Sequence, residues 1–176
     1  PRSRGTDRRN QIPGLVSIHA RPPEVEDRLM PGHWEGDLII GANNRSAVGT
    51  LVERTTRLVI LAKEDGTTAT AAAVGFSDKL NEVPRSLRLS MTYDQGREMV
   101  KHAEITQKTG TAIYFADPHS PWQRGSNENT NGLLRQYLPK GTDLSVYSQE
   151  ELDEIADSLN TRPRQTLDWR TPLEVY

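Results

Sequence analysis

The sequence contains no cysteine among its 176 residues. This absence excludes a disulfide framework and any zinc site built from thiolates, and it is typical of proteins from a reducing compartment. An apolar run long enough to span a bilayer and a signal-peptide pattern are also missing. We therefore expect neither stabilisation by disulfide bonds nor a membrane partner.

A large excess of charge of one sign is missing as well. The chain has 22 Lys and Arg against 24 Asp and Glu, so the net charge of −2 does not by itself indicate a nucleic-acid partner. With 34% hydrophobic and 26% charged residues, the composition is typical of one folded domain. The chain begins with Pro1 rather than Met, and we expect it to be a fragment of a longer protein. Its first ten residues are basic, with Arg2, Arg4, Arg8 and Arg9.

Hydrophobic patterns divide the chain into an arm and a domain. Residues 1–31 have no repeating apolar pattern and predict a linker or basic arm. In residues 32–176, the runs "WEGDLIIG", "AVGTLVER" and "RLVILAK" predict three strands of an antiparallel meander. Helices are predicted after Thr68, from Arg97 to Gly110 and after Ser148, and the strands "LRLSMTYD" and "TAIYF" flank the middle one. This order predicts an α/β fold, a mixed five-stranded sheet flanked by helices, as in the ribonuclease-H-like fold.

Three acids occupy positions in these elements where chemistry is expected. Asp37 interrupts the apolar strand "GDLII", where an acid is costly unless it is paired or bound to a metal. Asp94 ends the strand "LSMTYD", and strand ends are where open α/β sheets hold their sites. Glu128 lies in the first turn of a further predicted helix, on the same side as Arg135. Each acid has an ordinary alternative, as a turn residue or as a charge at a helix dipole.

Three converging carboxylates favour Mg²⁺ or Mn²⁺, which prefer oxygen ligands. Two such ions about 3.5–4 Å apart activate the attacking oxygen and stabilise the leaving oxygen of a phosphodiester. Other acids compete for these roles. Asp117 is the rival for the third acid, and Glu35 shares the strand face of Asp37 but is expected to form a salt bridge. Glu98 and His102 have ligand spacing on one predicted helix, although no third ligand accompanies them.

Long strings of the sequence resemble the IS-thirty family of bacterial insertion-sequence transposases, from about Gly32 to the C-terminus. They include "GHWEGDLIIG", "TYDQGREM", "YFADPHSPWQRGSNENTNGLLRQYLPKGTDLS" and "LNTRPRQTLDWRTPLEVY". The resemblance implies a DDE transposase core with a ribonuclease-H-like fold, in which Asp37, Asp94 and Glu128 match the catalytic, metal-binding triad. The 33 residues between Asp94 and Glu128 fit that pattern, and Arg135 matches a basic residue seven positions after the Glu. The helix-turn-helix region by which the family recognises element ends has no counterpart in this sequence, so we expect little sequence preference.

The resemblance also implies a function. With Mg²⁺, or Mn²⁺ in its place, and two ions when DNA is bound, the triad would cut at the element's end. It would then join the released 3′-hydroxyl to target DNA. DNA is the implied partner, a homo-oligomer is expected on DNA, and the expected location is the bacterial cytoplasm, at the nucleoid. Two other functions stay open: a ribonuclease-H-like nuclease that only hydrolyses, and a catalytically silent DNA-binding or assembly module.

Basic side chains near the third acid are the candidates for DNA contact. They are Arg124, Arg135 and Lys140, with ordinary solvated charges as the alternative. Trp122 precedes them in the loop before Glu128. Its ring either anchors that loop in the core or stacks on an unpaired base.

Overall fold

The structure is a computed structural model that describes residues 12–28, 30–163, 167 and 170–175. Within these ranges, some side chains lie outside the description: those of Glu26, Asp27, Pro121, Arg124, Ser126, Asn127, Glu128, Leu173 and Val175.

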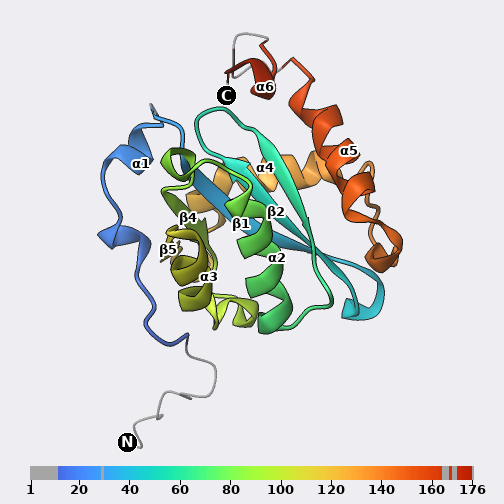
Figure 1. Ribbon diagram of the computed structural model, residues 1–176, viewed down its shortest axis with the longest axis horizontal. Coiled ribbons are helices and arrows are strands. Elements are labelled where there is room, and N and C mark those ends of the chain that lie inside the picture. Colours follow the sequence, from blue (N-terminus) through green and yellow to red (C-terminus); the bar gives the residue numbers. More distant parts are fainter. Residues whose placement is uncertain (1–11, 29, 164–166, 168–169, 176) are drawn as a thin grey trace, which may run out of the picture.

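A five-stranded sheet in the order β3-β2-β1-β4-β5 forms the centre of the fold (Figure 1). Its strands are β1 (His33–Ile40), β2 (Ala47–Glu53), β3 (Val59–Lys63), β4 (Ser90–Tyr93) and β5 (Ala112–Phe115). The first three strands pair antiparallel, whereas β4 pairs parallel with both β1 and β5. The predicted meander and the mixed five-stranded sheet are therefore confirmed.

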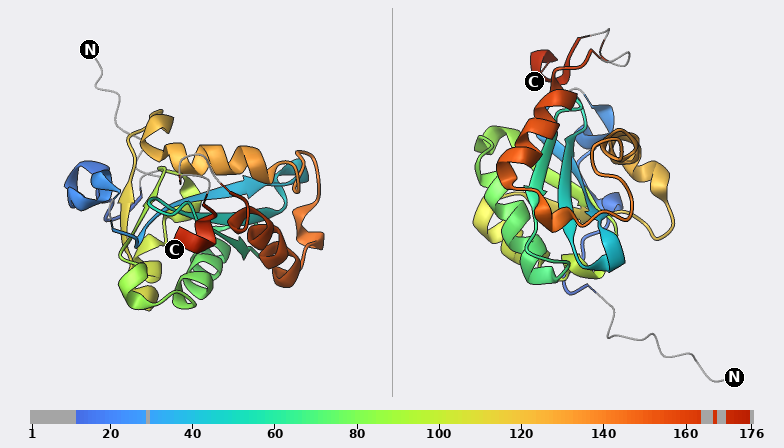
Figure 2. Two further views of the ribbon diagram at one scale, coloured as in Figure 1. Left: turned by 90° about the horizontal axis from the view of Figure 1, so that it is seen from above. Right: turned by 90° about the vertical axis from the view of Figure 1, so that its right-hand side faces the viewer.

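Helices cover both faces of this sheet. The longer ones are α2 (Ala69–Asn81), α3 (His102–Thr109), α4 (Gly125–Leu134) and α5 (Gln149–Asn160), and two short ones are α1 (Glu24–Asp27) and α6 (Pro172–Val175). In Figure 2, α2 and α3 lie on one side of the sheet and α4 on the other. Helix α5 packs along the edge strand β3. The sheet is thus packed between helices on its two faces.

Local signals set the ends of most helices. The Thr68 hydroxyl accepts a hydrogen bond from the N–H of Ala71 at 3.1 Å, and α2 starts there as predicted. Ser148 and Glu151 form the predicted capping box of α5. The helix predicted from Arg97 begins only at His102, because residues 97–99 form a separate 3₁₀ turn and Lys101 has a non-helical backbone.

Alternation along β1 directs its side chains to two separate cores. Trp34 joins the core under α2 and α3, together with Phe76 and Tyr93. Ile39 joins the core under α4 and α5, together with Leu134. Because side chains of a strand alternate between faces, Glu35 and Asp37 share the α4 face with Ile39. An acidic pair of positions is thus placed beside an otherwise apolar core.

The described part of the segment before the sheet, residues 12–28, lies against the domain (Figure 1). Ile12, Ile18 and Val25 are buried, and the N–H of Phe115 donates to the carbonyl of Val16 at 2.8 Å. Ser17 forms a parallel bridge with Phe115 of β5. Residues 1–11 lie outside the described residues, and the division into an arm over 1–31 and a domain over 32–176 stays a prediction.

Candidate active site

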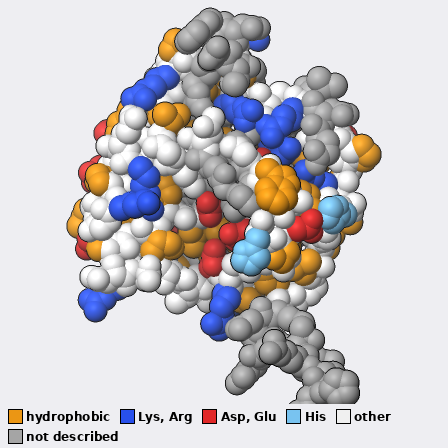
Figure 3. Space-filling model, turned by 180° about the vertical axis from the view of Figure 1, so that it is seen from behind, with side chains coloured by type: hydrophobic (Ala, Val, Ile, Leu, Met, Phe, Trp, Pro, Cys, Tyr) orange, Lys and Arg blue, Asp and Glu red, His pale blue; other side chains and the backbone are white. Residues whose placement is uncertain are grey.

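Asp37 lies within β1, and Asp94 directly follows the neighbouring parallel strand β4. In the pairing of β1 with β4, Glu35 lies opposite Thr92. Each aspartate follows this pair by two residues, and paired strands lie about 4.8 Å apart, so the two backbone positions are near each other. Both side chains are partly exposed. Figure 3 shows acidic side chains gathered near the middle of the face on the α4 side.

Tyr93 lies directly beneath this pair. Its side chain is fully buried, and its hydroxyl donates to Oε1 of Glu98 at 3.0 Å. Gly36 makes room for the ring, because a Cβ at this position would lie 2.9 Å from Cδ2 of Tyr93. Burial raises the pKa of the Tyr93 phenol well above its ordinary value, and the negative charges of Glu98, Asp37 and Asp94 raise it further. The charges of both aspartates therefore contribute to the raised pKa of Tyr93.

Helix α4 holds Asp37 directly. The side-chain amide of Asn131 donates to Oδ2 of Asp37 at 2.9 Å, and the N–H of Leu38 donates to Oδ1 at 2.9 Å. Residues three apart on a helix lie on the same side, so the backbone position of Glu128 is one turn from Asn131 on the side toward Asp37. The Glu128 side chain lies outside the described residues. Among the described residues, no three His, Asp or Glu side chains form a group that suits a metal, and the triad with Glu128 stays a prediction.

Asp94 ends β4 in a turn and borders a cavity. Its Oδ1 accepts the N–H of Gly96 at 2.9 Å, which is the turn alternative considered from the sequence. The carboxylate also lines a cavity of about 410 Å³, together with Gln95, Asp117 and His119. The turn thus orients a partly exposed acid at the border of this cavity.

Asp117 organises the loop that leads into α4. Its Oδ2 accepts from Nε2 of Gln123 at 3.0 Å and lies 2.7 Å from Nε2 of His19, while its own N–H donates to Oε1 of Gln123 at 2.8 Å. The hydrogen bond from Gln123, followed by that from His19, lowers the pKa of Asp117. These bonds tie the loop to the segment before the sheet.

The predicted DNA-contact residues flank α4 in the sequence, with Arg124 before it and Arg135 and Lys140 after it. Arg135 is partly buried, and its guanidinium donates to the carbonyl groups of Leu138 at 3.3 Å and Ile40 at 3.4 Å. Lys140 is exposed. The Arg124 side chain lies outside the described residues. Trp122 is 73% exposed and does not anchor its loop in the core.

The remaining alternatives from the sequence resolve into structural contacts. Nη1 of Arg54 lies 2.5 Å from Oε1 of Glu35, so the expected salt bridge of Glu35 is confirmed. Glu98 lies before the helix that contains His102, and the His102 ring bonds through Nε2 to the carbonyl of Pro13 at 2.7 Å. Glu98 and His102 therefore do not share a site.

Sequence reasoning missed a group of arginines beside the acids. Arg21, Arg28 and Arg54 line a cavity of about 380 Å³ together with Trp122. Two of these arginines come from the segment interpreted as a linker, which shows no local pattern. Only its packing against the sheet brings them to the site.

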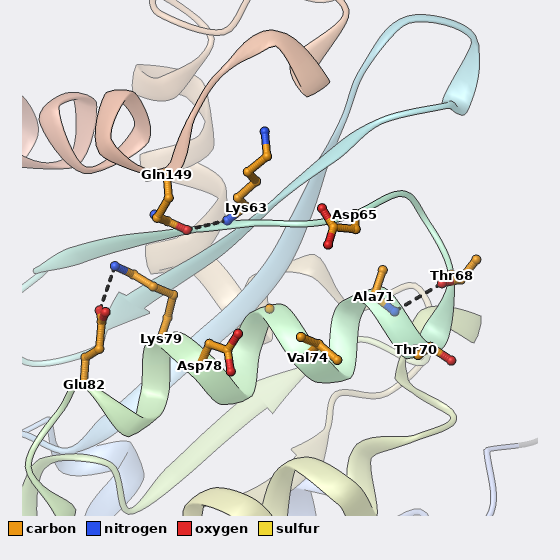
Figure 4. A pocket seen from close by; sticks show the side chains of 11 residues that line it. Lys63, Asp65, Thr68, Thr70, Ala71, Val74, Asp78, Lys79, Glu82 and Gln149 are labelled. Carbon is orange, nitrogen blue, oxygen red and sulfur yellow. Dashed lines mark hydrogen bonds and ion pairs between the residues drawn. The ribbon is translucent and has the colours of Figure 1, made fainter.

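A second charged cavity lies on the opposite side, between β3, α2 and α5 (Figure 4). Its volume is about 520 Å³. Nζ of Lys79 pairs there with Glu82 at 2.8 Å and with Asp153 at 3.1 Å. Beside it, Glu64 is buried, and burial followed by the charges of Asp65 and Asp78 raises its pKa to about 9.

The amino-acid sequence matches the integrase core domain family over residues 27–121. It is 70% identical over 175 residues to the transposase for insertion sequence element IS1086 of Cupriavidus metallidurans, covering 99% of this chain and 52% of that protein. It is 48% identical over 158 residues to the transposase InsI for insertion sequence element IS30A of Escherichia coli, covering 90% of this chain and 41% of that protein. The chain thus spans about half the length of these relatives.

Solved structures share the fold at low sequence identity. A chain of the simian T-cell lymphotropic virus intasome in complex with PP2A regulatory subunit B56 gamma has a TM-score of 0.65 at 17% identity, over 83% of this chain and 54% of that one. The HTLV-2 integrase catalytic core domain in complex with magnesium has a TM-score of 0.58 at 17% identity, over 84% of this chain and 97% of that one. These similarities confirm the ribonuclease-H-like fold class.

Within the part of the chain that the structure describes, every helix is too short or too polar to cross a membrane. The family match covers more than half of the chain, and the relatives confirm the resemblance to IS-thirty transposases. The chain belongs to the integrase core domain family, as the core of an IS-thirty-type transposase.

Proposed function

We propose that this chain cuts DNA at transposon ends and joins the released strand to target DNA. The observation that supports this most is the parallel pairing of β1 and β4, in which Glu35 lies opposite Thr92, because Asp37 and Asp94 each follow this pair by two residues and are partly exposed. Paired carboxylates at such a position suit phosphodiester chemistry that is assisted by cations. The half-length match to transposases supports the same reaction.

The donor set fits Mg²⁺ or Mn²⁺, because it consists of carboxylate oxygens in a chain without cysteine. Asp37, Asp94 and Glu128 would hold the metal, with two ions expected when DNA is bound. When bound, such cations activate the attacking oxygen and stabilise the leaving oxygen.

Fixed donors orient the two aspartates before substrate binds. Asn131 and the N–H of Leu38 each hold one oxygen of Asp37, and the N–H of Gly96 holds Asp94. Hydrogen bonds to a carboxylate favour its ionised form. Orientation in advance lowers the entropic cost of aligning the reacting groups.

DNA is the proposed partner, held through its phosphates by Arg124, Arg135 and Lys140. A homo-oligomer would form on DNA, because joining brings two element ends together. This activity would take place in the bacterial cytoplasm, at the nucleoid.

A branched DNA that mimics the joined product tests the chemistry without recognition of element ends, because release of the donor strand reverses joining. With Mg²⁺, the chain is expected to release the donor and reseal the target strand, and Asp37→Asn is expected to do neither. Hydrolysed fragments without resealing would indicate a nuclease that only hydrolyses. A lack of both products at saturating protein and DNA would contradict the proposal.

A further inference from the structure

The cavity beside the acids is lined by cationic and aromatic groups. Its described lining includes Arg21, Arg28, Arg54, His19 and Trp122, and none of the described lining residues is acidic. Its volume of about 380 Å³ is too small for a duplex and large enough for part of one nucleotide.

Protein contacts position the guanidinium groups. Arg54 pairs with Glu35 at 2.5 Å, and its Nε donates to the carbonyl of Val25 at 3.3 Å. Nη1 of Arg21 donates to Oγ1 of Thr92 at 3.0 Å. Nη1 of Arg28 donates to the carbonyl of Arg54 at 3.3 Å. Because these side chains are already ordered, little rotamer freedom is lost when an anion binds.

Trp122 supplies a different kind of surface. Its side chain is 73% exposed, although the neighbouring Gln123 is held by two hydrogen bonds to Asp117. An exposed indole on an anchored loop offers a flat face to a nucleic-acid base, and stacking of this kind needs a base that is not already paired and stacked.

The cavity also lies one step along the strands from the acids. The partners of Arg54 and Arg21 are Glu35 and Thr92, which lie opposite each other in β1 and β4. Each is two residues before an aspartate, Asp37 or Asp94, on the same strand face. Two residues of a β-strand span about 6.6 Å. A DNA strand whose phosphate reaches the acids would therefore have its neighbouring nucleotide at the cavity.

We propose that this cavity binds one unpaired nucleotide of the DNA substrate, with its base on Trp122 and its phosphate at Arg28, which is less buried than Arg21 and Arg54. The inference rests on the proposed function only in taking DNA as the ligand. It adds that the substrate has an unpaired nucleotide beside the reacting phosphate.

The test measures binding without cleavage, in buffer with chelator instead of metal. Fluorescence anisotropy gives the affinity of the chain for a blunt duplex and for the same duplex with a short single-stranded overhang. It also gives the affinity for a series of such overhangs in which each nucleotide in turn is replaced by an abasic site. The variants are Trp122→Ala, Trp122→Phe, Arg28→Gln and, as a charge-matched control on the opposite face, Lys108→Gln of α3. A thermal melt verifies that each variant folds.

Trp122→Ala is expected to weaken binding of the intact overhang at least about fivefold, the lower end for one base–aromatic stack. It should leave the blunt duplex unchanged, and Trp122→Phe should retain most of the affinity. The wild-type chain should bind one of the abasic overhangs as weakly as Trp122→Ala binds the intact one. Arg28→Gln should weaken binding of intact and abasic overhangs alike and flatten the salt dependence, whereas Lys108→Gln should do neither.

Equal losses on blunt and overhang DNA in Trp122→Ala, or no loss on either, would overturn the base contact. Equal effects of Arg28→Gln and Lys108→Gln would overturn the phosphate contact. Because no bond is cut in this test, failure of the branched-DNA reaction with a retained overhang preference would remove the proposed function and leave the cavity assignment standing.

Discussion

Acidic side chains on the two sides of this molecule differ in their exposure to solvent and in their hydrogen-bond donors. Asp37 lies within β1 and Asp94 directly after β4, and both are partly exposed and held by amide or backbone donors. Glu64 follows β3 on the other side of the molecule, 5% exposed, and its pKa is raised to about 9. Glu64 is therefore protonated at neutral pH. Access to solvent and to hydrogen-bond donors, rather than the number of acids, distinguishes the candidate active site from the surroundings of the buried Glu64.

Close packing explains why Glu64 stays protonated. A Cβ at Gly75 would lie 2.5 Å from Oε2 of Glu64, so only glycine at this position leaves room for the carboxyl group. Neither carboxyl oxygen has a hydrogen-bond partner among the described residues. Glu35 is as deeply buried, but its carboxylate forms an ion pair with Arg54 at 2.5 Å.

The largest expected effect comes from neutralising Asp94, compared with neutralising an acid on the other side of the molecule. Asp94→Asn should reduce metal-dependent cleavage and joining below detection, because a ligand of the proposed site is lost. Its melting temperature without metal should stay close to that of the original chain, since a charge is removed from beside Asp37. The matched change on the other side, Asp78→Asn, should leave activity unchanged. Equal activity of the two variants would remove Asp94 from the mechanism.

A smaller effect is expected from breaking the buried ion pair. Glu35→Gln should lower the free energy of unfolding by about 3 kcal/mol, because the Arg54 guanidinium is left buried without its carboxylate. Denaturant titration measures this change. Glu82→Gln, at the exposed end of the Lys79 pair, is the control and should cost less than about 1 kcal/mol. Similar losses in both variants would show that burial of the pair adds nothing.

The smallest expected effect is an increase in the free energy of unfolding in the variant Glu64→Gln. Between pH 5 and 8, a group with a folded-state pKa of about 9 and an ordinary value of 4.5 keeps its proton in the folded chain and loses it on unfolding. The free energy of unfolding therefore falls as pH rises through this window. Glu64→Gln should flatten that decline and be more stable than the original chain by at least about 1 kcal/mol at pH 8, with little difference at pH 5. Parallel pH profiles of the two proteins would show that Glu64 is ionised when folded.

Local patterns predicted much of the fold but only part of the site. The strand runs, the Thr68 cap and the Ser148 capping box depend on neighbours in sequence, and each was predicted correctly. The positions of Asp37 and Asp94 at strand and strand end were also predicted, but their register is a tertiary property. The cavity that joins Arg21 to Trp122 depends on two segments about a hundred residues apart, and no periodicity in either indicates it. The helical spacing of Glu98 and His102 does not hold, because the helix begins only at His102, after the non-helical Lys101.

Diffraction from crystals soaked in Mn²⁺, recorded at a wavelength where manganese scatters anomalously, tests the central claim most directly. We predict an anomalous peak within about 2.5 Å of carboxylate oxygens from both Asp37 and Asp94, with Glu128 reaching the same ion. A peak held by Asp65 and Asp78 instead, or a lack of any peak shared by Asp37 and Asp94 at saturating Mn²⁺, would contradict the account.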